Sequence, residues 1–563
     1  MTAAPNSQDR FARSAGRQLL LFAVASIAAV GLLMLGLSWA SSHSGDARIG
    51  KGVDAATGTV TLALADEPPQ LDSILSTDTI SAMVLGHVME GLLRNAEGGK
   101  LAPGVAERWE ITDTGATFWL RPNARWSDGK PVTARDFVFA WRRAVDPASA
   151  SEYATIFFGI RNAEAINKGE LPISSLGVQA LGDRILRVEL ARPVPYFDKL
   201  MAFNSFNPMR EDFYKAAAGR YGADADTLLY NGPFTIRRWV HGAHLRMEKN
   251  AFYWDSNRVK IKALDFAYFS SDPNTLINLY KDGKIAVAGL NPESLTDALV
   301  RRWQINRFMR GSVAYIEFNH RKDRPTANLH LRRAIQLVID SDEVVYRVIK
   351  LPGNLPGRSL FPVWLDGVNG KFRQEYPAPK IVPDPVEARR QLALAMKELG
   401  LETMPPLTML SDDGALGDKM TEYFQETFRR ELGLKIRIDK QIFKQRLAKM
   451  SAGDFDFVLA AWSPDYADPL TFADLFASWN SNNRGRYKNP RLDQLVEVAR
   501  NSTDVHTRMG AFGEIQRILF EDPPMVPTYE PGVVFVVDPR LKGVVRRAVG
   551  FDPDYTSARI VGE

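Results

Sequence analysis

The sequence predicts an α/β protein with more than one domain, and three observations support this prediction. The chain has 563 residues. A single hydrophobic core does not usually organise a chain of this length, so we expect two to four domains. Strand-like and helix-like patterns alternate through its second half, as they do in α/β proteins. Hydrophobic residues make up 45% of the chain and charged residues 24%, which are the proportions of an ordinary globular protein.

Charge and cysteine content exclude several classes of function. The 71 basic and 66 acidic residues leave a formal charge of +5, and no long Lys/Arg block is present, so no nucleic-acid partner is expected. The chain has no cysteine, which excludes disulfides, thiol nucleophiles and cysteine metal ligands. It also excludes a lipid on an N-terminal cysteine, so any membrane tether has to be the polypeptide itself.

The N-terminus predicts export. Arg10, Arg13 and Arg17 precede an apolar stretch at residues 19–39, which is long enough to cross a bilayer as one helix with its C-terminal side outside. Residues 1–42 are either a signal peptide, cleaved after the small residues around Trp39, or an uncleaved signal anchor. Both alternatives place the chain from about residue 43 outside the cytoplasm. Residues 43–56 are small and polar, and we expect a linker.

In the first part of the body, alternation of polar and apolar residues predicts strands, and helical spacing predicts helices. The first strand is expected at 59–64. Thr133 is expected to open a helix, because Asp136 stands three residues later, close to a capping box. Around that helix the predicted elements are a helix at 80–93, an extended segment at 117–120, a turn at 127–130, and strands at 185–190, 232–236, 245–248 and 263–268.

In the later part, short strands alternate with longer helices, which predicts an α/β lobe. The strands are expected at 407–410, 435–439 and 457–461. The helices are expected at 275–281, 329–339, 385–399, 419–432, 492–499 and 507–521.

No catalytic motif is found. The chain has no Gly-x-Ser-x-Gly elbow, no His-Glu-x-x-His and no Gly-x-Gly-x-x-Gly after a strand. His241 and His244 lie in a segment that reads as a strand or turn, where alternate residues share a face and third ones do not. A surface pair is therefore expected there. The sequence predicts no enzymatic activity, no cofactor and no metal.

Two tracts, residues 126–141 and 455–469, combine aromatic residues with a carboxylate. In the second tract an apolar strand leads into Trp462, Asp465 and Tyr466. A carboxylate held between aromatic rings at a strand end suits the binding of a cationic group. The residues alone leave another interpretation open, in which the Asp caps a helix among core aromatics.

Short motifs follow one another in a specific order along the chain. They are Glu90-Gly-Leu-Leu93, Leu101-Ala-Pro-Gly-Val-Ala-Glu-Arg-Trp109, Thr117-Phe-Trp-Leu-Arg-Pro-Asn-Ala-Arg-Trp-Ser-Asp-Gly-Lys-Pro-Val-Thr133, Asp136-Phe-Val-Phe-Ala-Trp141, Pro193-Val-Pro-Tyr-Phe197, Tyr230-Asn-Gly-Pro-Phe234, Lys249-Asn-Ala-Phe-Tyr-Trp254, Phe318-Asn319, Leu331-Arg-Arg-Ala334 and Ala461-Trp-Ser-Pro-Asp-Tyr-Ala-Asp-Pro469. With this series the chain, from about Thr59 onward, resembles the periplasmic oligopeptide-binding proteins. These are the substrate-binding components of peptide ABC importers (solute-binding protein family 5).

The resemblance implies an α/β fold of the periplasmic binding protein-like II class, with two lobes and an extra inserted domain, preceded by one N-terminal hydrophobic helix. Domain I would be discontinuous, at 57–100, 222–310 and 533–563. Domain II would be inserted at 101–221, and domain III would span 311–532. The ligand would lie between domains I and III, which close over it by a hinge motion.

The resemblance also implies the site residues. Asp465 would pair with the α-ammonium group of a peptide, beside Trp462 and Tyr466. The backbone from Ala461 to Ser463 would pair with the peptide main chain as an added strand. An extended segment with Thr77 and Thr79 would oppose it, and Tyr153 and Phe443 would line the pocket.

The sequence departs from the family at the far end of the pocket. Members that bind tri- and tetrapeptides neutralise the peptide C-terminus with arginines three and twelve residues before the pocket Trp. Here those positions are Leu459 and Met450. Arg446, Arg484 and Arg486 are the nearby candidates to replace them, and the sequence does not choose among the three. Ligand length therefore stays open.

The resemblance predicts a binding protein that captures short peptides and delivers them to ABC permease subunits in the inner membrane. It would be a periplasmic monomer that contacts the membrane only through the N-terminal helix, either soluble after signal cleavage or anchored by residues 19–39. The alternatives are a receptor for a non-peptide solute, namely an amine-bearing small molecule, a metal chelate or a saccharide, and a chaperone for peptides or unfolded chains at the membrane.

Overall fold

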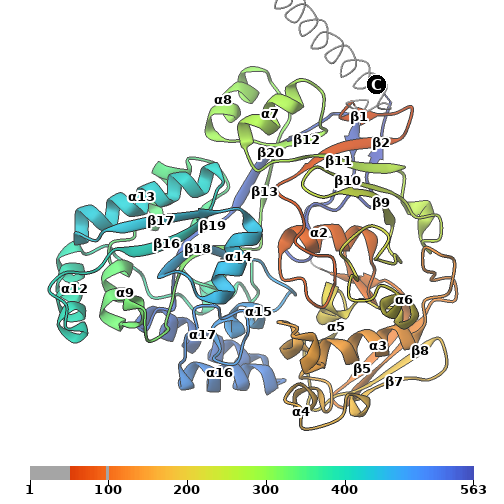
Figure 1. The fold of residues 1–563 in the computed structure, drawn as a ribbon, viewed down its shortest axis with the longest axis horizontal. Helices are drawn as coiled ribbons and strands as arrows, with labels where there is room; N and C mark the ends of the chain where they lie inside the picture. The colour runs from red at the N-terminus through yellow and green to blue at the C-terminus, as the bar shows by residue number, and fades with distance from the viewer. Residues whose placement is uncertain (1–50, 97–99, 563) are drawn as a thin grey trace, which may run out of the picture. The chain divides into compact units, whose positions relative to one another are not determined.

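The computed structural model describes residues 51–96 and 100–562 (Figure 1). The predicted signal peptide or anchor at 1–42, with its apolar stretch 19–39, lies outside the described residues. Within them, no helix combines the length and the apolar character that a membrane crossing requires. We use "first lobe" for the residues before β14 and after β19, and "second lobe" for the residues from β14 to β19.

The first lobe contains a five-stranded sheet in the order β1-β2-β11-β10-β9. β2 and β11 are parallel, and the other neighbours are antiparallel. The residue ranges are β1 Val53–Asp54, β2 Thr59–Leu64, β9 Phe234–Val240, β10 His244–Lys249 and β11 Ala263–Phe269, with helix α2 at Thr79–Val88. The predicted strand 59–64 is confirmed. Val53, inside the expected linker 43–56, is fully buried and pairs with Val60, so pairing begins earlier than the polar composition suggested.

A second sheet of the first lobe is antiparallel, in the order β5-β6-β8-β7. Its strands are β5 Ala106–Thr112, β6 Gly115–Leu120, β7 Val178–Ala180 and β8 Ile185–Glu189. Helix α3 (Ala134–Val145) packs beside it. Smaller elements complete the region: β3 Leu93–Asn95, β4 Leu101–Pro103, α4 Ala163–Asn167, α5 Phe197–Leu200 and α6 Glu211–Ala216.

The contacts at the start of α3 show the structural role of the first aromatic tract, residues 126–141. The Asp136 carboxylate accepts the backbone N–H of Thr133 at 2.8 Å and the indole N–H of Trp126 at 3.1 Å. The indole of Trp141 donates to Phe206 O at 3.1 Å, and both tryptophans are fully buried. This tract is therefore part of the hydrophobic core, and the predicted opening of the helix by Thr133 is confirmed.

A three-stranded sheet joins the lobes. Its order is β12-β20-β13, with β12 Val287–Gly289, β13 Ile305–Met309 and β20 Gly532–Val537. Helices α7 (Pro273–Lys281) and α8 (Pro292–Val300) accompany it (Figure 1). β13 leads into β14, and β19 leads into β20 through Pro531, whose carbonyl accepts the Arg310 N–H at 2.9 Å. We call β13 and β20 the connecting strands, because the chain passes between the lobes along them.

The second lobe contains a six-stranded mixed sheet in the order β15-β19-β14-β18-β16-β17. The strands are β14 Val313–Phe318, β15 Leu355–Pro356, β16 Leu407–Asp412, β17 Ile436–Gln441, β18 Phe457–Trp462 and β19 Met525–Glu530. The helices include α9 Leu329–Gln336, α12 Pro385–Leu399, α13 Ala415–Leu432, α14 Phe443–Ala452, α15 Leu470–Ala473, α16 Pro490–Asn501 and α17 Val505–Glu521. Every strand and helix predicted for this lobe is present.

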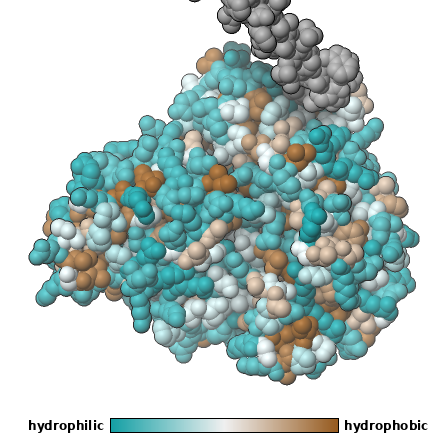
Figure 2. Space-filling view, in the orientation of Figure 1, coloured by the Kyte–Doolittle hydropathy of each residue, from teal (hydrophilic) through white to brown (hydrophobic). Residues whose placement is uncertain are grey.

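Caps explain why some limits were predicted to the residue. Helix α12 begins after Asp384, whose carboxylate accepts the N–H groups of Val386 and Glu387, and Pro385 occupies the first helical position. It ends at Gly400, which adopts the left-handed conformation with φ +67°. On the face shown in Figure 2, hydrophilic residues dominate and the apolar residues form small, separate patches, as on an ordinary protein surface.

Candidate functional site

The site begins with an unpaired edge of β18. On one side this strand pairs with β14 along its whole length, from Phe457 to Trp462. On the other side β16 pairs with it only at Phe457 and Val458. Residues 459–462 therefore have no neighbouring strand on that side among the described residues.

The direction of the free backbone groups follows from Leu459. Its carbonyl accepts a hydrogen bond from the Arg446 guanidinium at 2.8 Å, so it points away from β14. Backbone groups of alternate residues point to the same side of a strand. The N–H and C=O of Ala461 therefore also face the unpaired side, and Ala461 is exposed to solvent.

Asp465 follows β18 at the end of this edge. Its backbone N–H donates to Thr471 Oγ1 at 3.0 Å, and that hydroxyl lies 3.3 Å from Asp465 Oδ2. The phenol of Tyr153 donates to Asp465 Oδ1 at 2.8 Å. Burial raises the pKa of Asp465 to about 8, although the Tyr153 and Thr471 hydrogen bonds counteract it in part.

This carboxylate has no counter-ion. Among the ion pairs of the described residues, none includes Asp465, and the nearby Asp474 raises its pKa further. A desolvated carboxylate without a cation is unfavourable when ionised. It can therefore attract a cationic group from outside the chain.

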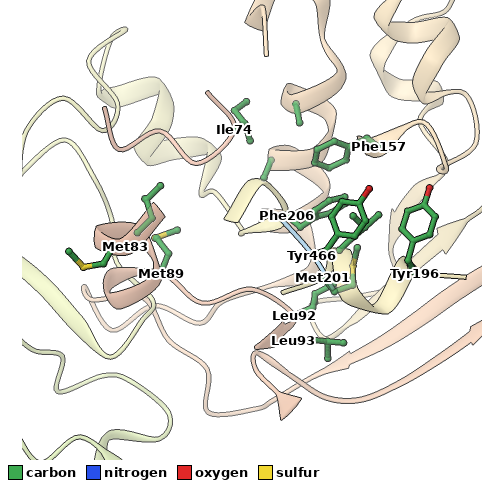
Figure 3. Close-up of a cluster of buried hydrophobic side chains, with 14 of the residues drawn as sticks. Ile74, Met83, Met89, Leu92, Leu93, Phe157, Tyr196, Met201, Phe206 and Tyr466 are labelled. Atoms are coloured by element: carbon green, nitrogen blue, oxygen red, sulfur yellow. The ribbon is translucent and has the colours of Figure 1, made fainter. Parts of the chain in front are cut away.

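Trp462 and Tyr466 hold the segment around Asp465. The Trp462 indole donates to Thr471 O at 2.8 Å, and its side chain is 9% exposed. Tyr466 is 3% exposed and stacks on Tyr196 of the first lobe, with ring centroids 5.4 Å apart (Figure 3). Ser463, which follows Trp462 in the chain, is half-buried. Both aromatic rings are thus packed into the protein, and they position the carboxylate.

The first lobe contributes Tyr153 and Thr77. Tyr153 is 5% exposed and reaches Asp465 across the boundary between the lobes. Thr77 Oγ1 accepts from Arg484 Nη2 at 3.3 Å. Thr79 is exposed and is the first residue of helix α2, after the cap Asp78. The extended conformation expected over 77–79 therefore ends at Asp78, because that cap starts the helix.

Further along the edge, Phe443 begins α14. The guanidinium of Arg446 lies 5.3 Å from its ring centroid. Met450 is buried in a small cluster with Leu410 and Val458, and Leu459 packs at the rim of the second-lobe core. Neither position has a charged side chain.

The sequence did not single out Thr471 or Glu152. Thr471 bonds to both Trp462 and Asp465 and so fixes the segment between them. Glu152 pairs with Arg484 across the lobes, with Nη2–Oε2 at 2.9 Å. The only signal available in the sequence was that Thr471 follows the motif-bearing segment 461–469 by two residues.

Comparisons with known proteins agree with this architecture. Residues 100–484 match the family of bacterial extracellular solute-binding proteins, family 5, middle region. The chain is 32% identical to the periplasmic oligopeptide-binding protein OppA of Salmonella typhimurium, over 78% of this chain and 81% of the relative. It aligns with Listeria monocytogenes OppA bound to peptide at a TM-score of 0.85 and 30% identity, over 90% of this chain and 100% of the other.

A third comparison concerns the lobes. The chain aligns at a TM-score of 0.58 and 27% identity with a periplasmic murein tripeptide-binding protein, MppA, in an unliganded open form, over 87% of this chain and 95% of the other. The likeness to the peptide-bound structure is thus the closer of the two. The lobe-crossing hydrogen bonds of Tyr153 and Thr77 agree with a closed arrangement.

The fold and this site define a two-lobed substrate-binding protein. The chain belongs to the solute-binding protein family 5, whose members are the binding components of transporters and not enzymes. The α/β fold with two lobes that the motifs implied is therefore confirmed. The relatives are periplasmic or extracellular peptide-binding proteins.

Proposed function

We propose that this protein captures short peptides between its lobes and that Asp465 binds their α-ammonium group. One observation carries the proposal: Asp465 is a partly buried carboxylate with a raised pKa and no counter-ion, at the end of an unpaired strand edge. A peptide supplies both missing partners, because it has a cationic amino terminus and a main chain that can extend a sheet.

The peptide then lies beside residues 459–463 as an added strand. Ala461 presents its N–H and C=O to the unpaired side, and Ser463 continues the same alternation. With the ammonium group at Asp465, the peptide runs antiparallel to β18. Main-chain hydrogen bonds of this kind depend little on the side chains of the ligand, so we expect broad sequence tolerance.

We extend the proposal to the location of the protein in the cell and to its transport partner. Residues 1–42 direct the chain out of the cytoplasm, and the loaded protein, a monomer, delivers its peptide to the permease of an ABC importer. Domain limits near residues 310 and 532 fit this role, because the connecting strands meet the second lobe there. Reporter fusions at residue 50 and at the C-terminus test the export: both should report an extracytoplasmic position, and a cytoplasmic C-terminus would contradict it.

Calorimetry with the body from residue 43 onward tests the binding. Pools of di- to pentapeptides should give saturable heats with micromolar or tighter affinity, and mass spectrometry should find the peptides intact afterwards. Heat from an amine-bearing non-peptide compound with none from any peptide pool would assign the protein to a non-peptide solute. Binding of unfolded chains alone would assign a chaperone role.

A further inference from the structure

Arg446 is a buried cation without an anionic partner. It lies in helix α14, and its side chain is 9% exposed. Among the described residues, no carboxylate lies within ion-pair distance of it. Its one hydrogen bond goes to a neutral acceptor, the Leu459 carbonyl, and its buried Nε has no partner. A buried guanidinium in this state is costly unless an anion completes its environment.

The position of Arg446 links it to the unpaired edge of β18. Leu459 is the first residue of β18 beyond its pairing with β16. The Arg446 guanidinium, which bonds to the Leu459 carbonyl, therefore lies at the start of the unpaired edge. Asp465 follows the other end of that edge. Arg446 also precedes Met450 by four residues, and residues four apart lie on the same face of a helix. Arg446 thus places a positive charge one turn away from the position of Met450.

The other two arginines near the edge are less suitable. Arg484 already pairs with Glu152 Oε2 at 2.9 Å and bonds to Thr77. Arg486 is exposed on the surface of the protein. Asp412 and Glu317 act on Arg446 only at longer range, and Gly485 N donates to the Glu317 carboxylate. Of the three candidates, only Arg446 is both buried and without an anionic partner.

We propose that Arg446 binds the C-terminal carboxylate of the peptide, and that the protein therefore selects peptides with a free carboxyl end. This inference rests on the proposed peptide-binding function. Residues 459–462 span about 10 Å at roughly 3.3 Å per residue. An extended peptide can therefore pair along this edge through roughly three to four residues.

The experiment compares three forms of one tripeptide and one tetrapeptide: the free acid, the C-terminal amide and the N-acetylated acid. Affinities are measured for the native protein, Arg446→Met, Arg446→Lys and the control Arg486→Gln. The native protein should prefer the acid to the amide at least tenfold, and Arg486→Gln should keep that preference. Arg446→Met should bind acid and amide alike, and Arg446→Lys should fall between.

Thermal unfolding without peptide separates a binding role from a structural one. Replacing an unpaired buried charge by an apolar side chain is often neutral or stabilising, so the melting temperature of Arg446→Met should not fall. Should that variant fail to fold, the acid-to-amide ratios of the native protein and Arg446→Lys decide the matter. A native protein that binds acid and amide equally, or an Arg446 variant that keeps the native ratio, overturns the inference but leaves peptide binding intact. If no form of either peptide binds, the proposed function itself fails, and this inference with it.

Discussion

At the scale of single residues, Asp465 differs from the neighbouring Asp468 in having no cationic partner among the described residues. Asp468 lies three residues further on, is 3% exposed, and pairs with Arg508 at 2.6 Å. Glu530 of the same lobe pairs with Arg373. These buried carboxylates find their cations inside the chain, and Asp465 does not. Without a ligand the raised pKa keeps Asp465 largely protonated, and a cationic ligand would supply the charge that the chain does not.

Replacing Asp465 by Ala should weaken the binding of free-amine peptides roughly 30-fold or more, because truncating one member of a desolvated charge pair costs about 2–5 kcal/mol. N-acetylated peptides should bind the native protein poorly and the variant hardly worse. The melting temperature without ligand should change little. Calorimetry with matched free and acetylated peptides makes the comparison, and native-like affinity of the variant for free amines would exclude Asp465 as the anchor.

The raised pKa of Asp465 predicts proton release on binding. The folded pKa is about 8, so the carboxyl group is mostly neutral at pH 6.5, and it must ionise to pair with an ammonium group. Affinity should therefore rise by up to about tenfold per pH unit below 8. It should fall again above 8, where the peptide amine loses its charge.

Calorimetry at pH 6.5 in buffers of different ionisation enthalpy measures the released protons, and Asp465→Asn should abolish both the release and the rise. The raised pKa of Asp465 also determines how its contribution to the stability of the folded protein changes with pH. The folded protein holds this proton between about pH 4 and 8 while the unfolded chain has lost it, so the contribution of Asp465 to the stability of the unliganded protein falls across that range. A flat pH profile of native binding would contradict the prediction.

At the scale of elements, strands and helices with strong local signals were predictable from local patterns, and the pairing edge was implied only by the family resemblance. Helix α12 carries its caps in the sequence, so its limits were predicted to the residue. The start of α2 at Thr79 depends on Asp78, whose capping role was not recognised. That β16 leaves β18 unpaired after Val458 is a property of sheet register between distant segments, which local patterns do not contain.

The unpaired edge predicts opposite effects for two neighbouring prolines. Proline has no N–H and is tolerated only where no ladder hydrogen bond is lost. The backbone N–H of Ala461 faces the unpaired side, so the Ala461→Pro variant should still fold. It should lose peptide affinity at least tenfold. The backbone N–H of Ala460 faces β14, where Ala460 is opposite Tyr315. Ala460→Pro would remove this ladder donor and should therefore clearly lower the melting temperature. Thermal unfolding and calorimetry on both variants test the assignment, and the reverse pattern would place the peptide elsewhere.

At the scale of the whole molecule, the lobes meet through several polar contacts as well as the Tyr466–Tyr196 ring stack. Tyr153 bonds to Asp465, Glu152 pairs with Arg484, and Lys199 donates to Ala467 O at 2.9 Å. Among the described elements, the chain crosses between the lobes only at the adjacent connecting strands. Two side-by-side crossings of this kind can act as a hinge about which one lobe rotates against the other.

Peptide should therefore close the molecule. Small-angle scattering of the body from residue 43 onward should show a smaller radius of gyration with saturating peptide than without it, and the melting temperature should rise with peptide concentration. Asp465→Ala at the same peptide concentration, below its weakened dissociation constant, should scatter like the free protein. An unchanged radius together with tight binding would argue against a hinge.

The hydrogen bond from Tyr153 to Asp465 has a consequence for how long a peptide stays bound. In the proposed function, the carboxylate that binds the ammonium group also fastens one lobe to the other, so this contact would enclose a captured peptide. Departure then requires the lobes to part first. The residence time of the peptide is thus set by the frequency of opening, and a partner that pulls the lobes apart would trigger release without having to compete for the peptide.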